Sequence, residues 1–549
     1  MRGRIFLGGA ALAGAAVFAA VGAASGPDGP TRTTVPSALP KAAANAPASQ
    51  LSPELRQTMV AQGSMPLENP QGIIGWYGYE NDAPSADNPA LPQMVPAPGG
   101  TTEAQKTEPD KNTYLVLENQ TGADPNSAYG THFLFQGHEA AARDAQGNKL
   151  GYITRINLDA DTAHRVTLLA SKDVTGAPIS TIDGSTWDPW AQRLLLTTES
   201  TSAPIYAATA GYPSQVEDVS GALGRGGYEG IQNDSAGNLW IVEDIGGAVK
   251  GATTAKQPNS FVYRYVPAKP GDLKNGRLQA LQVLNHAGQP ITVESQAALM
   301  APDQVAVHSY GVTLPTRWVT VHDTAVDGTA PFNANTAAKA AKATPFKRPE
   351  NGVFRPGSKF RDFYFSETGD TNATSPENGD PTTGAGGAGG WGGVFELTQS
   401  SPSASTGRIT MLYRGNQSVT GLDNIQFLSR DLVTLGEDAG DTLHTQRKAL
   451  DSAYVFDVET DYSTGAQPTR WLAEGRDPSA TLDAGAGGFG RNDGDNEITG
   501  IHVSNGDPGP DGILGARTPH LDHGEWRWFW TQQHGDNVTW EVTVASEDH

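Results

Sequence analysis

The sequence predicts an all-β protein, a six-bladed β-propeller preceded by a low-complexity N-terminal extension. Three observations support this prediction. The 549 residues include 65 glycines and 37 prolines, a composition that favours short strands and turns over long helices. Short apolar runs of strand length recur between residues 151 and 531, whereas helical periodicity is almost confined to residues 336–342. Finally, a unit that contains acidic residues recurs six times along the chain.

Residues 1–25 have the pattern of a secretory signal peptide. Arg2 and Arg4 precede a continuous apolar stretch from residue 5 to residue 24. The stretch is long enough for an uncleaved membrane anchor, but it is weakly apolar, and the small residues Gly22 and Ala24 suit a peptidase. We therefore expect a bacterial protein that is periplasmic or secreted. The export route stays open, because the two arginines are not adjacent.

Residues 26–110 are rich in Pro, Ala, Ser, Thr and Asn. A region of this composition buries little apolar surface by itself. We interpret it as a linker or as a segment that wraps the core. The β-propeller domain is then predicted to occupy residues 111–549.

Charge and cysteine content exclude several classes of function. The chain has 60 acidic and 38 basic residues and a net charge of -22, which repels nucleic acid and anionic lipid and attracts cations. After residue 25, no run approaches the ~20 apolar residues of a membrane-spanning helix. The absence of cysteine excludes disulfides, iron–sulfur clusters and thiol nucleophiles. We expect a monomer that meets small molecules, with no nucleic-acid or membrane partner.

Each recurring unit has two halves. The first is an acid beside small or polar residues, just before an apolar position; the second is an apolar run that ends in another polar side chain. The first acids lie 46, 74, 47, 73 and 74 residues apart, so the units have the size of propeller blades with insertions. These first acids are Asp183, Glu229, Asp303, Glu350, Asp423 and Glu497, and the acids that follow apolar runs include Glu199, Glu243 and Glu437.

In a β-propeller, the ends of the inner strands face one another at the mouth of a central channel. Carboxylates packed there repel each other and lose solvation unless cations neutralise them. One such acid could equally cap a turn, but six repeats favour a metal cluster. Several Ca²⁺ ions are expected, because the donors are oxygens rather than imidazoles or thiolates. The predicted ligands are Glu199, Glu229, Glu243, Glu350, Asp423, Glu437 and Glu497.

One unit carries positive charge beside its acid, in the sequence Arg348-Pro349-Glu350. A guanidinium next to carboxylate-bound cations is suited to bind phosphate, because it offers two parallel hydrogen bonds. A surface ion pair is the alternative interpretation of this triplet.

Five short segments give the sequence a more specific resemblance. They are residues 223–230 (Leu-Gly-Arg-Gly-Gly-Tyr-Glu-Gly), 348–352 (Arg-Pro-Glu-Asn-Gly), 423–425 (Asp-Asn-Ile), 497–500 (Glu-Ile-Thr-Gly) and 531–535 (Thr-Gln-Gln-His-Gly). They resemble, in the same order, the L-G-R-x-x-H-E-G, R-P-E, D-G/N-hydrophobic, E-x-T-G and Q-H-P-G motifs of the PhoX-type alkaline phosphatase family. The resemblance covers about residues 113–540.

This resemblance implies a six-bladed propeller that holds several Ca²⁺ ions together with iron and hydrolyses phosphomonoesters outside the cytoplasm. It implies metal binding by Glu199, Glu229 and Glu350, and phosphate contact by Arg348. Arg348 and Glu350 are the catalytic residues that it predicts. The expected substrate is a small-molecule phosphate ester, cleaved by metal-assisted phosphoryl transfer.

The chain departs from the family pattern at positions that concern iron. The family's L-T-C-E-E corresponds to residues 196–200, where Thr198 takes the place of a cysteine that helps to hold iron. Tyr228 takes the place of the histidine in H-E-G, and no proline follows His534. The presence of iron, and of full phosphatase activity, therefore stays open.

Two other functions fit the same residues. A calcium-dependent propeller lactonase or esterase resembles this chain through residues 229–231 and the following run 238–241, although it usually needs one Ca²⁺ and fewer acids. A non-catalytic binding propeller that uses calcium only for rigidity is favoured by the missing cysteine.

Overall fold

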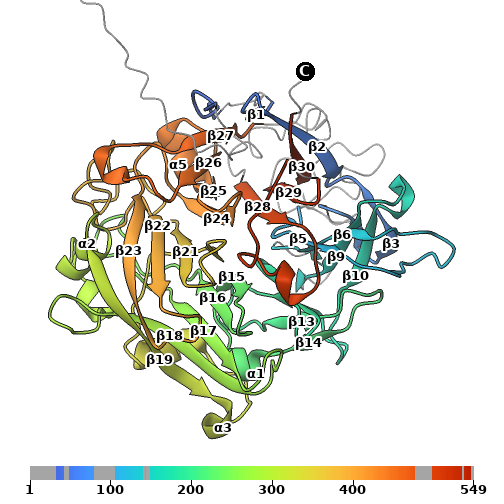
Figure 1. Ribbon diagram of the computed structural model, residues 1–549, viewed down its shortest axis with the longest axis horizontal. Helices are drawn as coiled ribbons and strands as arrows, with labels where there is room; N and C mark the ends of the chain where they lie inside the picture. Colours follow the sequence, from blue (N-terminus) through green and yellow to red (C-terminus); the bar gives the residue numbers. More distant parts are fainter. Residues whose placement is uncertain are drawn as a thin grey trace, which may run out of the picture.

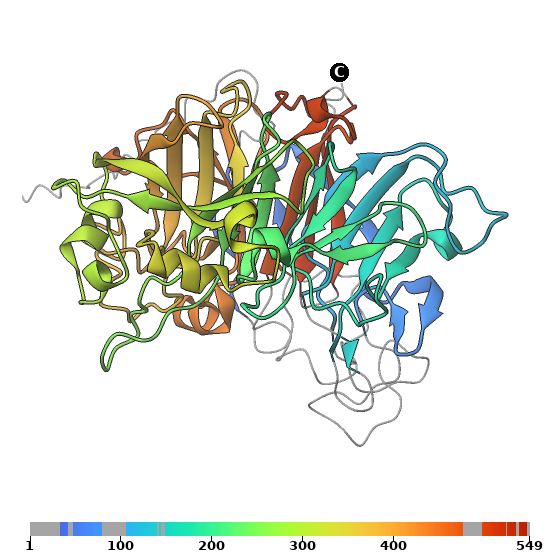
Figure 2. The ribbon, with the colours of Figure 1, turned by 90° about the horizontal axis from the view of Figure 1, so that it is seen from below.

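The computed structural model describes residues 33–41, 48–79, 106–139, 142–143, 149–475, 497–522, 524–533 and 537–545. The predicted signal peptide at residues 1–25 lies outside the described residues. Within them, β-strands make up most of the regular structure. The sheets are arranged radially around a common centre (Figure 1), and their strands run through the thickness of a disc (Figure 2). The predicted all-β, propeller-like architecture is thus confirmed.

Four of the large sheets contain four or five strands each in the described part of the chain. Neighbouring strands within each sheet are antiparallel. Three sheets have four strands: β5 (Thr113–Val116), β6 (His132–Gly137), β9 (Ile153–Asn157) and β10 (Val166–Ala170); β11 (Ser185–Asp188), β12 (Arg193–Leu196), β13 (Tyr206–Ala208) and β14 (Val216–Asp218); and β28 (Glu497–Ser504), β29 (Arg527–Gln533), β30 (Val538–Val544) and β2 (Leu55–Ala61). The fourth has β24 (Leu422–Phe427), β25 (Leu432–Glu437), β26 (Ser452–Asp457), β27 (Thr469–Ala473) and β1 (Gln50–Leu51).

A fifth large sheet has nine strands, which differs from the six separate blades expected. The long strand β19 (Thr313–Asp323) pairs with β18 on one side and with β23 on the other. β19 therefore lies between the outermost strands of two four-stranded sets, β18 and β23, and joins them. Along β19, the outer edges of both sets are paired. The two sets are β15 (Tyr228–Asn233), β16 (Leu239–Glu243), β17 (Val262–Pro267) and β18 (Gly276–Val283), and β20 (Gly352–Phe354), β21 (Asp362–Glu367), β22 (Gly393–Gln399) and β23 (Thr406–Arg414).

The recurring unit placed at Asp303 is not a propeller unit. Asp303 lies in helix α2, and the apolar run that follows it belongs to the joining strand β19. The helices of the described residues are short and lie between strands: α1 (Ser220–Leu223), α2 (Pro302–Val307), α3 (Thr324–Asp327), α4 (Ala334–Ala340), α5 (Gly440–Arg447), and the 3-10 turns η1 (Thr162–His164), η2 (Glu294–Gln296), η3 (Tyr462–Thr464) and η4 (Pro510–Gly512).

The first strand of each set lies at the centre of the ring. These strands are β5, β11, β15, β20, β24 and β28; each contacts the next, and β28 contacts β5. Apolar side chains fill the space between successive sheets. For example, the Trp240 ring lies 5.1 Å from the rings of Trp318 and Phe354, centre to centre. The core therefore consists of layers between sheets, and it fixes the inner strands relative to one another.

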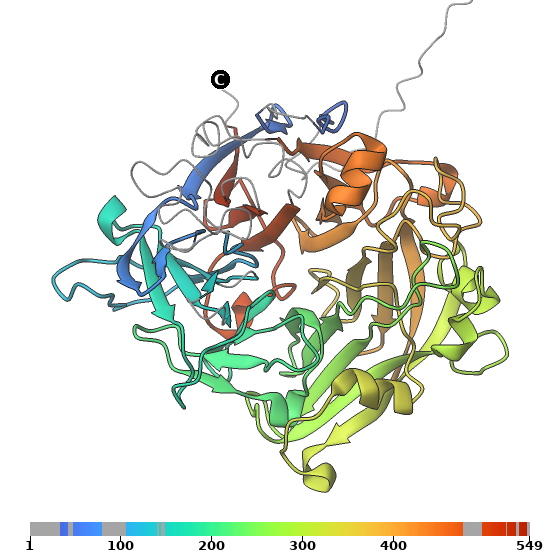
Figure 3. The same cartoon turned by 180° about the vertical axis from the view of Figure 1, so that it is seen from behind.

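Part of the segment 26–110, predicted to be a linker or to wrap the core, belongs to the folded ring. β2 pairs along its length with β30, and β1 pairs with β27, so N-terminal strands complete two sheets made mainly by the C-terminal half (Figure 3). Two small hairpins accompany the ring: β3 (Pro66–Gln71) with β4 (Ile74–Trp76), and β7 (Ala142–Arg143) with β8 (Lys149–Leu150).

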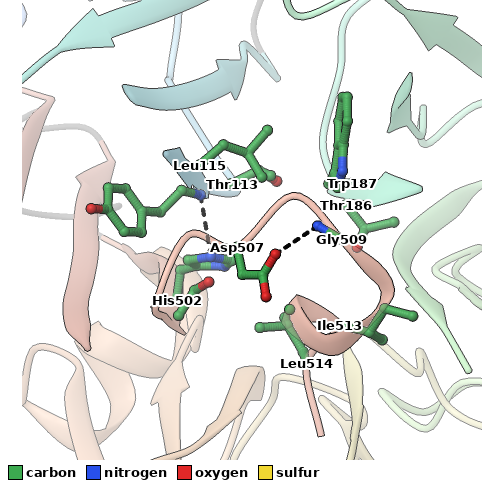
Figure 4. Close-up of a pocket in the computed structure, with 12 residues that line it drawn as sticks. Thr113, Leu115, Thr186, Trp187, His502, Asp507, Gly509, Ile513 and Leu514 are labelled. Atoms are coloured by element: carbon green, nitrogen blue, oxygen red, sulfur yellow. Dashed lines mark hydrogen bonds between the residues drawn. The ribbon is translucent and has the colours of Figure 1, made fainter. Parts of the chain in front are cut away.

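One end of the inner strands is covered by the loop of residues 505–522 (Figure 4). The amide of Val116, at the end of β5, donates to the carbonyl of Gly506 at 2.7 Å, and the Trp187 indole donates to that of Pro508 at 2.8 Å. Burial lowers the pKa of His502 to about 3, so this ring is neutral and accepts the Tyr114 amide at 3.2 Å. The space left under the loop is about 20 Å³, enough for a single water molecule.

No helix in the described ranges has the length and apolarity needed to span a bilayer.

We expect the N-terminal strand β2 to stabilise the whole ring. Leu55 is buried among apolar side chains of the last sheet, so Leu55→Ala should lower the free energy of unfolding by about 2–5 kcal/mol. Thr58→Ala, at an exposed position of the same strand, should change it by less than about 0.5 kcal/mol. Chemical denaturation measures both. Equal stability of the two variants would contradict the role of β2.

Candidate metal centre

Acidic side chains converge at the end of the inner strands opposite the 505–522 loop. Each inner strand carries an acid at its start or within three residues before it, and neighbouring strands hold these acids side by side. Five of the six side chains are at most 5% exposed. In ring order, the acids are Asp110, Asp183, Glu229, Glu350, Asp423 and Glu497.

Four carboxylates form one close group. One oxygen from each of Glu199, Glu229, Asp244 and Glu350 lies within 4.8 Å of the others. Glu199 and Asp244 follow the second strands β12 and β16 and reach the centre from there. The amide of Asn351 donates to Glu229 at 2.7 Å and to Asp423 at 3.0 Å, so it links this group to the next acid of the ring.

A second group consists of Asp110, Glu139 and Asp183, again with one oxygen of each within 4.8 Å of the others. The Gln533 side chain donates to Asp110 and to Glu139, each at 3.0 Å. The Thr499 hydroxyl also donates to Asp110. Blades from both ends of the chain thus contribute to this group.

Burial and mutual repulsion disfavour the charged form of these acids. Burial, followed by repulsion from neighbouring carboxylates, raises the pKa well above the usual range for six of them. The buried ammonium of Lys111 lies among the same acids, where burial lowers its pKa, and it donates to Asn424 at 2.9 Å. The six acids are Asp110, Asp183, Glu199, Glu229, Glu350 and Glu497.

These donors fit hard cations. Ca²⁺ takes six to eight oxygen ligands at roughly 2.3–2.6 Å, and clustered carboxylates, amides and hydroxyls are the donors present. A thiolate is missing from the whole sequence. Thr198 donates its hydroxyl to the carbonyl of Pro204 at 3.0 Å, and Tyr228 donates to that of Leu223 at 2.7 Å. Neither side chain belongs to the two carboxylate groups, and His534 lies outside the described residues.

Two of the expected ligands lie elsewhere. Glu243 is buried inside its own sheet, where it accepts from the Tyr263 hydroxyl at 3.1 Å and the Asn335 amide at 3.0 Å. Burial raises its pKa to about 8. Glu437 forms an ion pair with Arg447 at 3.0 Å. Side chains alternate along a strand, and the residue after Glu243, Asp244, belongs to the four-carboxylate group. Burial raises the pKa of Glu497, and charge repulsion by Asp438, the residue after Glu437, raises it further.

Four acids of the two carboxylate groups are not among the predicted ligands: Asp244, Asp110, Glu139 and Asp183. Asp183 was recognised only as part of a recurring unit, and Glu139 follows an apolar run without a distinctive motif. Asp110 had a usable signal, because it lies 73 residues before Asp183, a spacing found elsewhere among the units. Asp110 precedes β5, which is an inner strand. The prediction places the sixth unit at Asp303 instead, and that residue lies in helix α2.

Arg348 is held beside the four-carboxylate group by an uncommon backbone conformation. Its φ is 62°, in the left-handed region that disfavours residues with a side chain. The amide of Thr368 donates to its carbonyl at 3.0 Å and stabilises this turn. The guanidinium Nε and Nη2 donate to Asp244 at 2.7–2.9 Å, and Nη2 lies 3.4 Å from Glu350. Burial alone would lower the pKa of Arg348, but these carboxylates raise it.

No known family model matches the sequence, and no curated protein matches it. Among solved structures, that of Pseudomonas fluorescens PhoX in complex with vanadate, a transition state analogue, is similar with a TM-score of 0.54 and 11% identity, over 93% of this chain and 98% of that chain. A GH43_1 enzyme from Xanthomonas citri gives a TM-score of 0.28 at 11% identity, over 64% and 87% of the two chains. The likeness to PhoX concerns the fold of nearly the whole chain.

The raised pKa values predict how stability depends on pH when no cation is bound. An acid whose pKa is higher in the folded than in the unfolded state stabilises the fold below the unfolded-state value, about 4, and this contribution is lost as pH rises through the folded-state value. Chelated protein should therefore melt at a lower temperature at about pH 8 than at about pH 5. Saturating Ca²⁺ should raise the melting temperature most at the higher pH.

Thermal melts with chelator or Ca²⁺ at the two pH values test this prediction. Mg²⁺ at the same ionic strength is the control for non-specific screening. A melting temperature at pH 8 that neither chelator nor Ca²⁺ changes would contradict the metal centre.

Proposed function

We propose that the protein is an exported, calcium-dependent phosphomonoesterase whose site lies at the acidic end of a six-bladed β-propeller. The nine-stranded sheet counts as two blades in this proposal, because it contains two inner strands, β15 and β20. The observation that carries the proposal is the position of Arg348 against the group formed by Glu199, Glu229, Asp244 and Glu350. The fold shared with PhoX, a protein whose structure contains vanadate, supports it.

Each side chain has a separate role in this proposal. Cations held by the two carboxylate groups would neutralise the phosphate and polarise its bond to the leaving oxygen. Arg348 would donate to the phosphate oxygens and orient them, while Asp244 keeps the guanidinium in place through its two-point contact. Glu350 would serve as a metal ligand, and it is the second carboxylate beside the guanidinium. Export rests on residues 1–25.

A non-catalytic calcium-stabilised propeller is the second candidate. The close pairing of Arg348 with Asp244, at 2.7 Å, favours it, because a structural ion pair would have the same geometry. The two candidates differ in what Arg348 does when a phosphate ester is present.

Replacing Arg348 separates them. Arg348→Ala should lower kcat/KM for a phosphomonoester about 100-fold or more, because it removes a charge-assisted contact to the reacting group. Arg355→Ala is the matched control, since Arg355 forms surface ion pairs with Asp431 and Glu459 near the far end of β20. Steady-state assays on Ca²⁺-loaded protein measure both. Unchanged turnover in Arg348→Ala, or no turnover in the wild type, would favour the binding propeller.

A further inference from the structure

A hairpin after strand β16 brings a second cation towards Arg348. The chain leaves β16 at Asp244 and folds back on itself before it enters β17. Val249 and Lys256 pair as antiparallel neighbours, and the amide of Gln257 donates to the carbonyl of Ala248 at 2.8 Å. Backbone hydrogen bonds therefore fix the position of Lys256.

Asp370 connects this hairpin to the turn that holds Arg348. One oxygen of its carboxylate accepts from the backbone amide of Lys256 at 2.9 Å and from the ammonium of Lys347 at 2.7 Å. Lys347 precedes Arg348, and its carbonyl accepts from the amide of Gly369 at 3.1 Å. A single buried carboxylate thus holds both segments together.

The ammonium of Lys256 has no ion pair among the described residues. The side-chain contact that it makes is a long hydrogen bond of 3.4 Å to the Thr371 hydroxyl. Two nearby lysines, in contrast, form ion pairs. Lys347 contacts Asp370 and Glu377 at 2.7 and 2.5 Å, and Lys250 contacts Glu377 at 2.9 Å.

The electrostatic neighbours of Lys256 belong to the candidate site. Burial lowers its pKa, and repulsion by Arg348 lowers it further, whereas Asp370, Asp244 and Glu350 act in the opposite direction. Arg348 uses Nε and Nη2 for Asp244, which leaves Nη1 for another acceptor. The Lys256 ammonium and Nη1 of Arg348 can therefore both donate hydrogen bonds to a further acceptor. An anion bound between these two positive charges would reduce their repulsion.

We propose that Lys256 is a second phosphate-binding residue, which acts together with Arg348 from the hairpin after β16. This inference rests on the proposed function, and it identifies the anionic group of the substrate as the ligand of both side chains. Asp244 holds the planar guanidinium of Arg348 in a fixed orientation. Lys256 makes fewer contacts and contributes a point charge from the hairpin.

Binding of inorganic phosphate tests this proposal without requiring turnover. Isothermal titration calorimetry on Ca²⁺-loaded protein should show a Kd about 10- to 100-fold higher for Lys256→Gln than for wild type, as expected for loss of one charge-assisted hydrogen bond. Lys256→Arg keeps the charge and should stay within about threefold of wild type. Lys172→Gln, an exposed lysine after β10, is the control for net charge.

The outcomes separate this inference from the proposed function. If wild type hydrolyses phosphomonoesters and Lys256→Gln has the same Kd for phosphate, the role of Lys256 is overturned while the function stands. If Lys256→Gln weakens phosphate binding but no variant shows turnover, the anion site stands and the enzymatic function fails. If wild type binds no phosphate, both are overturned. Equal melting temperatures and calcium contents of the variants would show that these changes are local.

Discussion

The crowding of carboxylates at one end of the ring is the constraint on which the rest of the structure depends. Two unit charges 4 Å apart repel by about 4 kcal/mol at an effective dielectric constant of 20, and groups of four and three acids lie within 4.8 Å here. Lys111 and Arg348 offset only part of this repulsion. Near neutral pH, bound cations would relieve the remaining repulsion, and cation binding at the two groups would then stabilise the fold.

The scaffold resists this repulsion by closing the ring and by burying paired charges. β2 joins the last sheet to the beginning of the chain, and β19 joins two other sheets. Behind Arg348, Lys347 and Lys250 share the carboxylate of Glu377 in the buried interior. Such pairs are costly to break because one buried charge is then left alone. The ion pairs of Lys347 therefore help to hold the adjacent turn of Arg348 in position.

The sequence predicted the all-β architecture and five acids that meet at the centre, because strand periodicity and an acid before each inner strand are local signals. It failed where side-chain direction or tertiary pairing decided the outcome. Glu243 and Glu437 were predicted as ligands in place of Asp244 and Asp438. The composition does not indicate which of two adjacent acids points towards the centre of the ring. The unit predicted at Asp303 is a helix followed by the joining strand β19. The place of β2 in the last sheet depends on pairing with residues about 480 positions away in sequence.

Anomalous diffraction from crystals grown with Ca²⁺ tests the central claim most directly. We expect strong peaks between Glu199, Glu229, Asp244 and Glu350 and between Asp110, Glu139 and Asp183, with oxygen ligands at roughly 2.3–2.6 Å. We also expect no difference across the iron edge, because the sequence contains no cysteine and both groups consist of carboxylates. A well-ordered crystal that shows neither group occupied, with the acids protonated or paired to side chains, would contradict the account.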